Sequence, residues 1–472
     1  MTSRLLFSSS LVLLVLAAGG GCGPTPKRAG AGASSTPAAE TTAAAPSYAA
    51  RLDRRDRGRK LYMAECSACH GEHGRGDGPA AAALEAKPRN FVDEKFKFRS
   101  TPSRKPPLRE DVMETIARGM PGSAMPPFAF LGEEERSLLT DYVLRLARID
   151  SMPVAAHVEL PPPPADGPAS LARGREAWAS MQCDKCHGSG GKGDGSSAAT
   201  LVDSAGRKIS ARDLTSGLLR RGKDAAEIVR TEFAGIDGTP MPSFAEVLTG
   251  EQAWDLARFV LSLKTAPSPP PADQVAYGRQ VVEQRMCFAC HVIEGRGGRV
   301  GPSLDVSIQK LRRPWIREFL KDPRAQGKLY PFTPYRMPDL KLTPVEIDAV
   351  VALFDSLAGP EVVAKTEAPA PASFSPELVA KGQLLYFLKC TECHNLGSVV
   401  PTPEAKRQGP DLIQVTQRLR YDWIPSWVKN PVAVYPGAAM VDTNLSDDDI
   451  EAVRAFLWKT SGGATPNKVS KQ

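Results

Sequence analysis

The sequence predicts an all-α protein in which four domains of similar size follow one another, joined by linkers rich in Pro and Ala. A C-x-x-C-H motif occurs four times, and roughly a hundred residues separate successive copies, enough for one small domain each. An amphipathic helical pattern closes each interval, near residues 133–148, 250–264, 344–357 and 447–459. Helix starts are indicated by Thr249 with Gln252, by Thr343 with Glu346, and by Ser446.

Composition divides the chain into seven segments. Residues 1–21 form a predicted signal peptide, residues 22–50 a flexible tether rich in Ala, Gly, Ser, Thr and Pro, and residues 461–472 a disordered tail. The four domains are expected at residues 51–150, 170–266, 274–359 and 376–460. The short proline-rich stretches between them act as semi-rigid spacers, so neighbouring domains are expected to stay close together.

The N-terminus has the pattern of a secretory signal, because Arg4 precedes an apolar run that is too short to span a membrane. Cys22 follows this run and is the one cysteine left over when the other eight are paired. Its context resembles a bacterial lipobox, although Gly19 stands where Leu is usual, so simple signal cleavage is the alternative. We predict export to the periplasmic face of a bacterial membrane, with a lipid anchor at Cys22.

The four motifs carry the chemistry of the chain. Two thiols one helical turn apart can add to the two vinyl groups of a haem, and the adjacent histidine is then aimed at the iron. The motif cysteines are Cys66, Cys69, Cys183, Cys186, Cys287, Cys290, Cys390 and Cys393. The motif histidines are His70, His187, His291 and His394. The sequence therefore predicts four covalently attached haem c groups.

Three other uses of a C-x-x-C pair are a thioredoxin-like redox pair, a zinc site and an ordinary disulfide. None of them requires a histidine directly after the second cysteine, and here it follows all four times. Zinc sites built from two pairs also place the pairs closer together than these motifs lie. The haem interpretation is therefore favoured.

These motifs resemble those of class I c-type cytochromes, and the resemblance covers nearly the whole chain after residue 50. It implies that the first and last helices of each domain cross, with a glycine on one helix meeting an aromatic residue on the other. The residues in these positions are Gly58, Gly174, Gly278 and Gly382, and Tyr142, Phe259, Phe354 and Phe456. It also implies that a Gly-Pro turn offers a carbonyl to the ligand histidine. Pro79, Pro302 and Pro410 hold this place, and Ser196 departs from it.

Haem iron needs a second axial ligand, and methionine is typical of soluble c cytochromes. Each of the last three domains has a single methionine after its motif, whereas the first offers Met113, Met120 and Met125. Met125 in GSAMPPF matches the methionine of GTPMPSF in the second domain. The predicted ligands are Met125, Met241, Met337 and Met440, which follow their histidines by 55, 54, 46 and 46 residues. Val441 replaces the proline that follows the other three.

The remaining histidines, His73 and His157, are too few to serve four irons and are expected on the surface. Arg89 and Arg212, which follow a shared H-G-x-x-G-x-G-D-G pattern, are candidates to bind haem propionates. Trp315 and Trp423 are the corresponding candidates in the last two domains.

The formal net charge of +7 is offset by two propionates on each haem, so the basic pI does not indicate nucleic-acid binding. An iron held by His and Met has no free site for a substrate, and we therefore expect an electron carrier with no catalytic residues. Its partners would be redox donors and acceptors of the cell envelope. A haem subunit of a quinol-oxidising, terminal oxidase or reductase complex, a haem peroxidase or reductase with one open distal site, and a sensor are the alternatives.

Overall fold

The computed structural model describes residues 47–93, 95–221, 223–266, 268–325, 335–366, 371, 373–398, 409–435 and 438–461. The predicted signal peptide, Cys22 with most of the tether, and residues 462–472 lie outside the described residues. From Tyr48 on, the chain forms one compact unit. Helices dominate it, and the strands of its described part, β1 (Val292–Ile293) and β2 (Arg296–Gly297), form one short antiparallel hairpin. The all-α prediction is confirmed.

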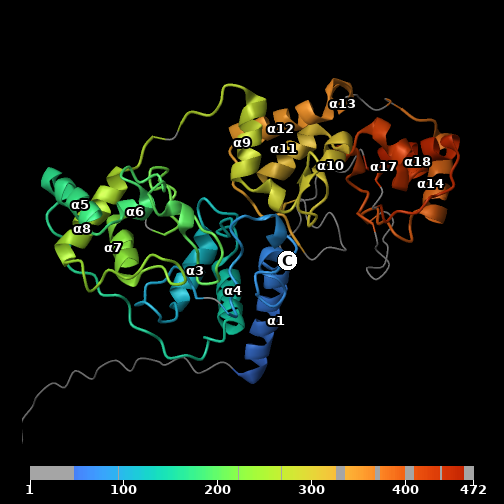
Figure 1. Ribbon diagram of the computed structural model, residues 1–472. Helices are drawn as coiled ribbons and strands as arrows, with labels where there is room; N and C mark the ends of the chain where they lie inside the picture. The colour runs from blue at the N-terminus through green and yellow to red at the C-terminus, as the bar shows by residue number, and fades with distance from the viewer. Residues whose placement is uncertain are drawn as a thin grey trace, which may run out of the picture. The chain divides into compact units, whose positions relative to one another are not determined.

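The helices fall into four repeats, each with its own hydrophobic core (Figure 1). The first holds α1 (Tyr48–Glu65), α2 (Ser67–His70), η1 (Ala81–Ala83), α3 (Arg109–Arg118) and α4 (Glu133–Leu146). The second holds α5 (Pro168–Ser180), α6 (Asp184–His187), η2 (Ala198–Thr200), α7 (Ala225–Ala234) and α8 (Gly250–Ser262). The third holds α9 (Gln274–Gln284), η3 (Cys287–Ala289), the hairpin, α10 (Leu304–Lys310), α11 (Arg313–Lys321), α12 (Pro344–Ala358) and α13 (Pro360–Thr366). The fourth holds α14 (Pro376–Lys389), α15 (Val415–Arg418), η5 (Tyr421–Trp423), α16 (Ile424–Lys429), α17 (Pro431–Val434) and α18 (Asp447–Ser461).

In the first, second and fourth repeats the first helix crosses the last one, and in the third repeat α9 crosses α12, as the resemblance implied. The four glycines lie at these crossings, and a Cβ there would overlap a backbone carbonyl of the other helix, that of Leu138, Asp255, Ala349 or Ala452. Tyr142, Phe259 and Phe456 contribute the nearest side chain to their glycines. In the third repeat Leu353 takes that place instead of the expected Phe354, which is buried in the core beside it. Glycine is needed because two backbones pack against each other without an intervening side chain.

The predicted helix starts are confirmed. The side chains of Thr249 and Thr343 accept hydrogen bonds from the third residue of their helices, and the capping boxes with Gln252 and Glu346 are complete. The hydroxyl of Ser446 accepts the N–H of Asp449 at 3.2 Å. Each cap satisfies a backbone donor that the helix itself leaves unpaired.

The first repeat contacts both the second and the third. Nη2 of Arg99, whose side chain is fully buried, lies 2.9 Å from a carboxylate oxygen of Asp237 in the second repeat. Nη1 of Arg324, in the third repeat, lies 2.6 Å from Oε1 of the buried Glu65 at the end of α1. One of these ion pairs therefore links the first repeat to the second, and the other links it to the third.

The third and fourth repeats join through matching segments. An isolated antiparallel bridge pairs Leu311 with Leu419, which hold equivalent positions in the two repeats. The backbone N–H groups of Arg312 and Arg420 each donate to a carbonyl of the opposite segment at 2.9 Å. The contact is therefore nearly symmetric.

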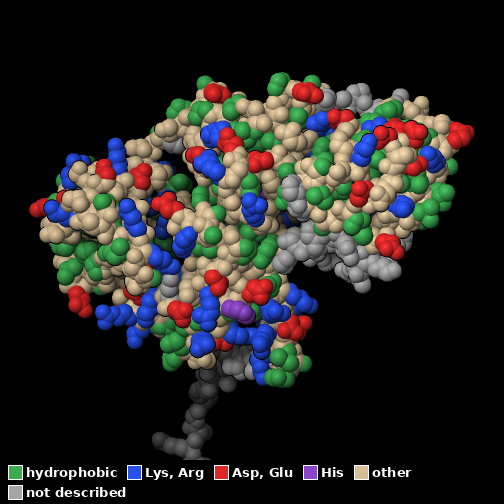
Figure 2. Space-filling view, turned by 45° about the vertical axis from the view of Figure 1, so that its right-hand side comes forward, with side chains coloured by type: hydrophobic (Ala, Val, Ile, Leu, Met, Phe, Trp, Pro, Cys, Tyr) green, Lys and Arg blue, Asp and Glu red, His purple; other side chains and the backbone are tan. Residues whose placement is uncertain are grey.

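Charges are mixed on the surface. On the face that Figure 2 shows, acidic and basic side chains are interspersed. Within the described residues, no helix combines the length and the apolar character that crossing a membrane requires.

Candidate haem-binding sites

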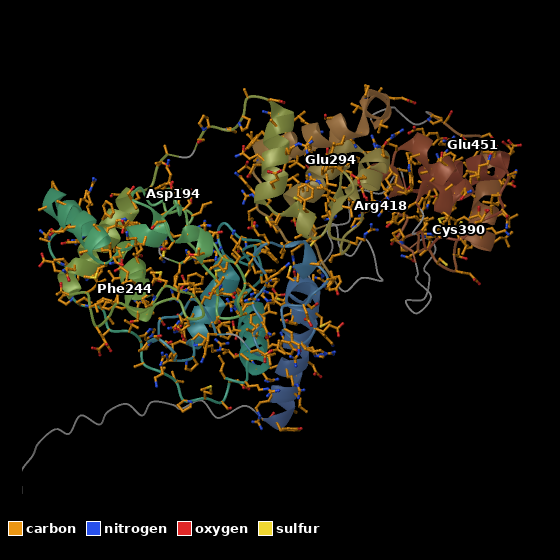
Figure 3. All side chains as sticks on the ribbon, in the orientation of Figure 1. Asp194, Phe244, Glu294, Cys390, Arg418 and Glu451 are labelled. Atoms are coloured by element: carbon orange, nitrogen blue, oxygen red, sulfur yellow. The ribbon has the colours of Figure 1, made fainter. Side chains whose placement is uncertain are left out.

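All four motifs fold into the same helical turn. The N–H of the motif histidine donates to the carbonyl of the first cysteine, at 2.9 Å for His70, His187 and His394 and at 3.0 Å for His291. The fourth motif begins where α14 ends, with Cys390 as its C-cap (Figure 3). This turn holds the two thiols of each pair one helical turn apart, the spacing that attachment to two vinyl groups requires.

The eight motif cysteines form no disulfides. Burial raises the pKa of the Cys69 and Cys183 thiols to about 12 and that of the Cys287 thiol to about 11. In the protein without haem, these three thiols are therefore protonated at neutral pH.

Each motif histidine has its Nδ1 tied to a backbone carbonyl. The acceptors lie at 3.0 Å for His70, 3.1 Å for His187, 2.8 Å for His291 and 2.9 Å for His394. Because a carbonyl only accepts, Nδ1 carries the proton, and Nε2 is left with the lone pair that can bind iron. Burial lowers the pKa of all four imidazoles, which favours the neutral ligand form.

The carbonyls that accept these histidine hydrogen bonds come from two different positions in the repeats. Pro302 and Pro410 supply them in the third and fourth repeats, as predicted. In the first repeat the acceptor is Arg89, so the assignment to Pro79 is wrong. The second repeat uses Arg212, which holds the position that corresponds to Arg89. The longer loops of the first two repeats thus bring a later carbonyl to the histidine.

A cavity of about 2270 Å³ runs through the first three repeats and is lined by their motif histidines and cysteines. Pockets for one ligand or cofactor span about 300–1,000 Å³, so this cavity has room for at least two of them. Among the described residues of the fourth repeat, Gln414 and Arg418 line it. A Cβ on Gly409 would overlap the ring of His394, so glycine leaves that imidazole its space.

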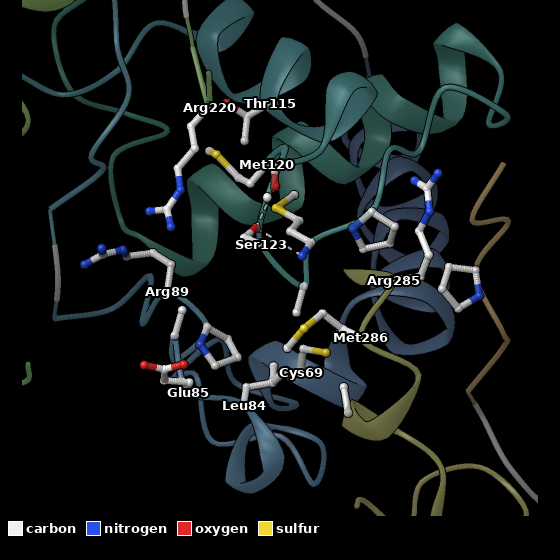
Figure 4. Close-up of a pocket in the computed structure, with 18 of the residues that line it drawn as sticks. Cys69, Leu84, Glu85, Arg89, Thr115, Met120, Ser123, Arg220, Arg285 and Met286 are labelled. Atoms are coloured by element: carbon white, nitrogen blue, oxygen red, sulfur yellow. Dashed lines mark hydrogen bonds between the residues drawn. The ribbon is translucent and has the colours of Figure 1, made fainter. Parts of the chain in front are cut away.

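Three of the four predicted methionine ligands, Met125, Met241 and Met337, line this cavity. Met125 and Met241 sit in identically built loops, since their N–H groups face the hydroxyls of Ser123 and Thr239 at 3.3 Å. Met120 lines the cavity too, beside Ser123, and so stays a second candidate in the first repeat (Figure 4). Met440 is half-buried and does not line this cavity.

Buried polar atoms in the cavity wall fit a haem with its two carboxylates. The indole Nε1 atoms of Trp178 and Trp315 and the Nε of Arg220 are buried without a hydrogen-bond partner. Such donors are costly unless an acceptor reaches them. Trp315 lines the cavity as expected, whereas Trp423 stacks on Trp427 with the ammonium of Lys310 at 5.4 Å from its ring.

His73 and His157 are exposed, which confirms the expectation that they lie on the surface. Lys97 and Glu232 are among the lining residues of the cavity that the sequence did not single out. Glu232 could in principle be found from sequence. It lies on the same buried face of α7 as Ile228 and Val229, and a carboxylate interrupts the apolar pattern of that face.

Two family models account for most of the described chain. A model for cytochrome c matches residues 55–147, 275–358 and 379–461. A model for subunit III of cbb3-type cytochrome c oxidase matches residues 169–260.

Two relatives are similar over part of the chain. The cbb3-type cytochrome c oxidase subunit FixP of Sinorhizobium medicae (strain WSM419) is 33% identical over 127 residues, which are 25% of this chain and 38% of that protein. The chain thus matches less than half of that relative's length. A solved structure of the Kuenenia stuttgartiensis reducing HAO-like protein complex Kustc0457/Kustc0458 shares 35% identity, with a TM-score of 0.43, over 44% of this chain and 96% of the other.

The matches to the cytochrome c model alone cover more than half of the chain, and each encloses one C-x-x-C-H motif with the crossing helices around it. Covalently bound haem c and electron transfer are the properties that such domains share. The chain belongs to the cytochrome c family and is a multihaem member of it.

Proposed function

We propose that the chain carries four covalent haem c groups and relays single electrons between redox partners outside the cytoplasm. The observation that carries the proposal is the shared cavity, in which three motif histidines and three methionines are brought together. Bound haem supplies one-electron chemistry at iron, and the protein's part is to hold each iron from two sides. A soft methionine ligand favours the ferrous state and raises the potential.

The contacts between repeats support a route in the order second, first, third, fourth, which differs from the order along the chain. Cys69 of the first repeat and Cys290 of the third line the same cavity, and their electrostatic interaction contributes to the raised pKa of Cys69. The sites of these two repeats therefore face each other. The second and fourth repeats would be the ends at which external partners exchange electrons.

The chain's own residues favour a carrier over a catalyst. If the predicted methionines bind the irons opposite the histidines, they would leave no coordination position for a substrate. The likeness to an oxidase subunit supports a second candidate, in which the chain is a haem subunit of a larger respiratory oxidase or reductase complex. A haem peroxidase or reductase with one open site is the third, and it would centre on Met440.

We further propose export with a lipid anchor at Cys22, which would hold the tether at the periplasmic face of a membrane. The short apolar signal and the leftover cysteine support this. Two or three acyl chains, at about 0.8 kcal/mol per buried methylene, anchor a protein firmly.

The haem count is tested by the intact mass of the exported, fully matured protein. Four haem increments are expected, and replacing both cysteines of one motif by serine should remove one of them. Three or fewer in the unaltered protein would refute the count.

A further inference from the structure

Five basic side chains gather where the first and second repeats meet inside the cavity. We call them the junction cluster: Arg89 and Lys97 of the first repeat with Arg207, Arg212 and Arg220 of the second. Figure 4 shows the side chains of Arg89 and Arg220 on the same side of the view, with Arg220 beside Met120, and both line the cavity. A residue of the second repeat thus reaches the site of the first.

Elsewhere in the same cavity the arginines have carboxylate partners. Arg285 lies 2.7 Å from Glu346, and Arg324 lies 2.6 Å from Glu65. Arg336 also lines the cavity and lies 3.9 Å from the same Glu65 oxygen, so two arginines share that carboxylate.

The carboxylates that line the cavity from the segments of the junction cluster are Glu85, Asp203 and Asp213. Asp203 is used by Arg207, at 2.7 Å, and Asp213 accepts the N–H and hydroxyl of Thr215. Among the described residues that line the cavity in these segments, the five cationic side chains of the junction cluster stand beside these three carboxylates. The cationic side chains of the cluster are half-buried, and like charges there repel one another more strongly than in bulk water unless an anion joins them.

Two members of the junction cluster, Arg220 and Lys97, lack sufficient anionic or hydrogen-bonding partners. The Nε of Arg220 is buried and has no hydrogen-bond partner. Burial and the nearby charge of Arg89 lower the pKa of Lys97 to about 8. Arg220 and Arg207 add to this effect, and the carboxylate of Asp203 only partly offsets it. An anion between these side chains would satisfy both.

We propose that the junction cluster is one shared carboxylate-binding site, in which Arg220 and Lys97 bind propionates of the haems of both the first and the second repeat. The proposal rests on the proposed function, because it requires a haem in each of these repeats. Carboxylates suit the site because a guanidinium binds them through two parallel N–H groups. The cofactors would then hold the two repeats together and share one electrostatic environment.

The test replaces Arg220 by Gln in the full-length holoprotein, with Arg118→Gln as the matched control. Arg118 pairs with Glu114 at 3.3 Å on the outer part of α3, and its loss removes the same charge away from the cavity. The midpoint potentials of the four haems are resolved by redox titration in chloride and again in phosphate. The intact mass of each protein gives the haem count independently.

In Arg220→Gln, two of the four haems should shift to lower potential, because a nearby positive charge disfavours ferric iron. At a fixed applied potential, the ferrous-to-ferric ratio of each of these haems should fall by about fivefold to tenfold. Arg118→Gln should shift none, and Arg220→Lys should restore part of the change. Unchanged potentials, or a shift at one haem alone, with four haems still attached would overturn the shared site and leave the proposed function standing. Wild-type potentials that depend on phosphate would also overturn it, since the occupant would then be a free anion. Fewer than four haems in the wild type would instead refute the proposed function.

Discussion

Neutralising Asp237 should weaken the contact between the first and second repeats and lower the stability of the protein. Its carboxylate lies 2.9 Å from Nη2 of Arg99, and the side chain of Arg99 is 0% exposed while that of Asp237 is 11% exposed. Asp237→Asn keeps the shape of the side chain but leaves a buried guanidinium without its countercharge. Breaking a buried pair in this way costs about 3–5 kcal/mol. We expect the lower end of this range, because the amide oxygen of Asn can still accept one hydrogen bond.

The matched control is Glu134→Gln, which breaks an ion pair of the same kind at the surface. Arg57 and Glu134 lie 2.7 Å apart with side chains 46% and 62% exposed. Such pairs contribute about 0–1 kcal/mol because water and salt screen them. The two substitutions therefore differ mainly in burial.

The assay is urea unfolding of the holoprotein, followed by far-ultraviolet circular dichroism. With a slope of about 1–3 kcal/mol per molar urea, a loss of about 3 kcal/mol lowers the midpoint by about 1–3 M. Adding Arg99→Met to Asp237→Asn should recover much of the loss, because the buried charge is then gone as well. If Asp237→Asn costs no more than Glu134→Gln, the contact between the repeats does not contribute as described.

Three further predictions concern the fourth repeat, the anchor and a buried acid. Gly382→Val should unfold or strongly destabilise the crossing of α14 with α18 in thermal melts, since a Cβ there overlaps a backbone carbonyl, whereas Gly190→Ala, with open space around it, should be neutral. Cys22→Ser should move the protein from the membrane to the soluble fraction of fractionated cells, and retention on the membrane would contradict the anchor. Burial raises the pKa of Glu232, so the folded state binds the proton more tightly than the unfolded state, and stability should fall as the pH rises above about 4.3. Glu232→Gln should remove this slope from urea midpoints measured between about pH 5 and 8, and an unchanged slope would exclude Glu232 as its source.

Local features of the fold follow from sequence because short-range chemistry decides them. The motif turns need only one helical turn, and the caps at Thr249 and Thr343 need three residues. The glycines at the crossings are also readable, since a close approach of two helices leaves no room for a Cβ. The exception is the third repeat, where a difference of one residue along α12 brings Leu353 rather than Phe354 to Gly278.

The partner of His70 shows where sequence reasoning failed. A proline is present at position 79, yet the carbonyl comes from Arg89, nineteen residues after the histidine. The sequence pattern that the first and second repeats share indicates the acceptor better than the proline does, because His187 of the second repeat bonds to the carbonyl of the equivalent Arg212. Which carbonyl reaches an imidazole depends on how the whole loop folds back, and turn chemistry alone does not determine that.

The sequence predicted Arg89 and Arg212 as propionate-binding candidates, but it could not predict the shared cavity or the other members of the junction cluster. Lys97 and Arg220 belong to different repeats and meet through packing between them. Nothing in either local sequence marks these residues, because a lysine or arginine in a loop is ordinarily solvated. Contacts between repeats arise from surface complementarity, which periodic patterns do not encode.

Carbon monoxide titration of the fully reduced protein tests most directly whether methionine closes every iron site. Carbon monoxide needs an open position on ferrous iron, so the unaltered protein should bind almost none. Met241→Ala serves as the positive control and should bind it at one haem in four, with the other three unchanged. Carbon monoxide binding at one haem of the unaltered protein, together with rapid turnover of peroxide or nitrite, would contradict the relay and would point first to the fourth repeat, where Met440 lacks the following proline.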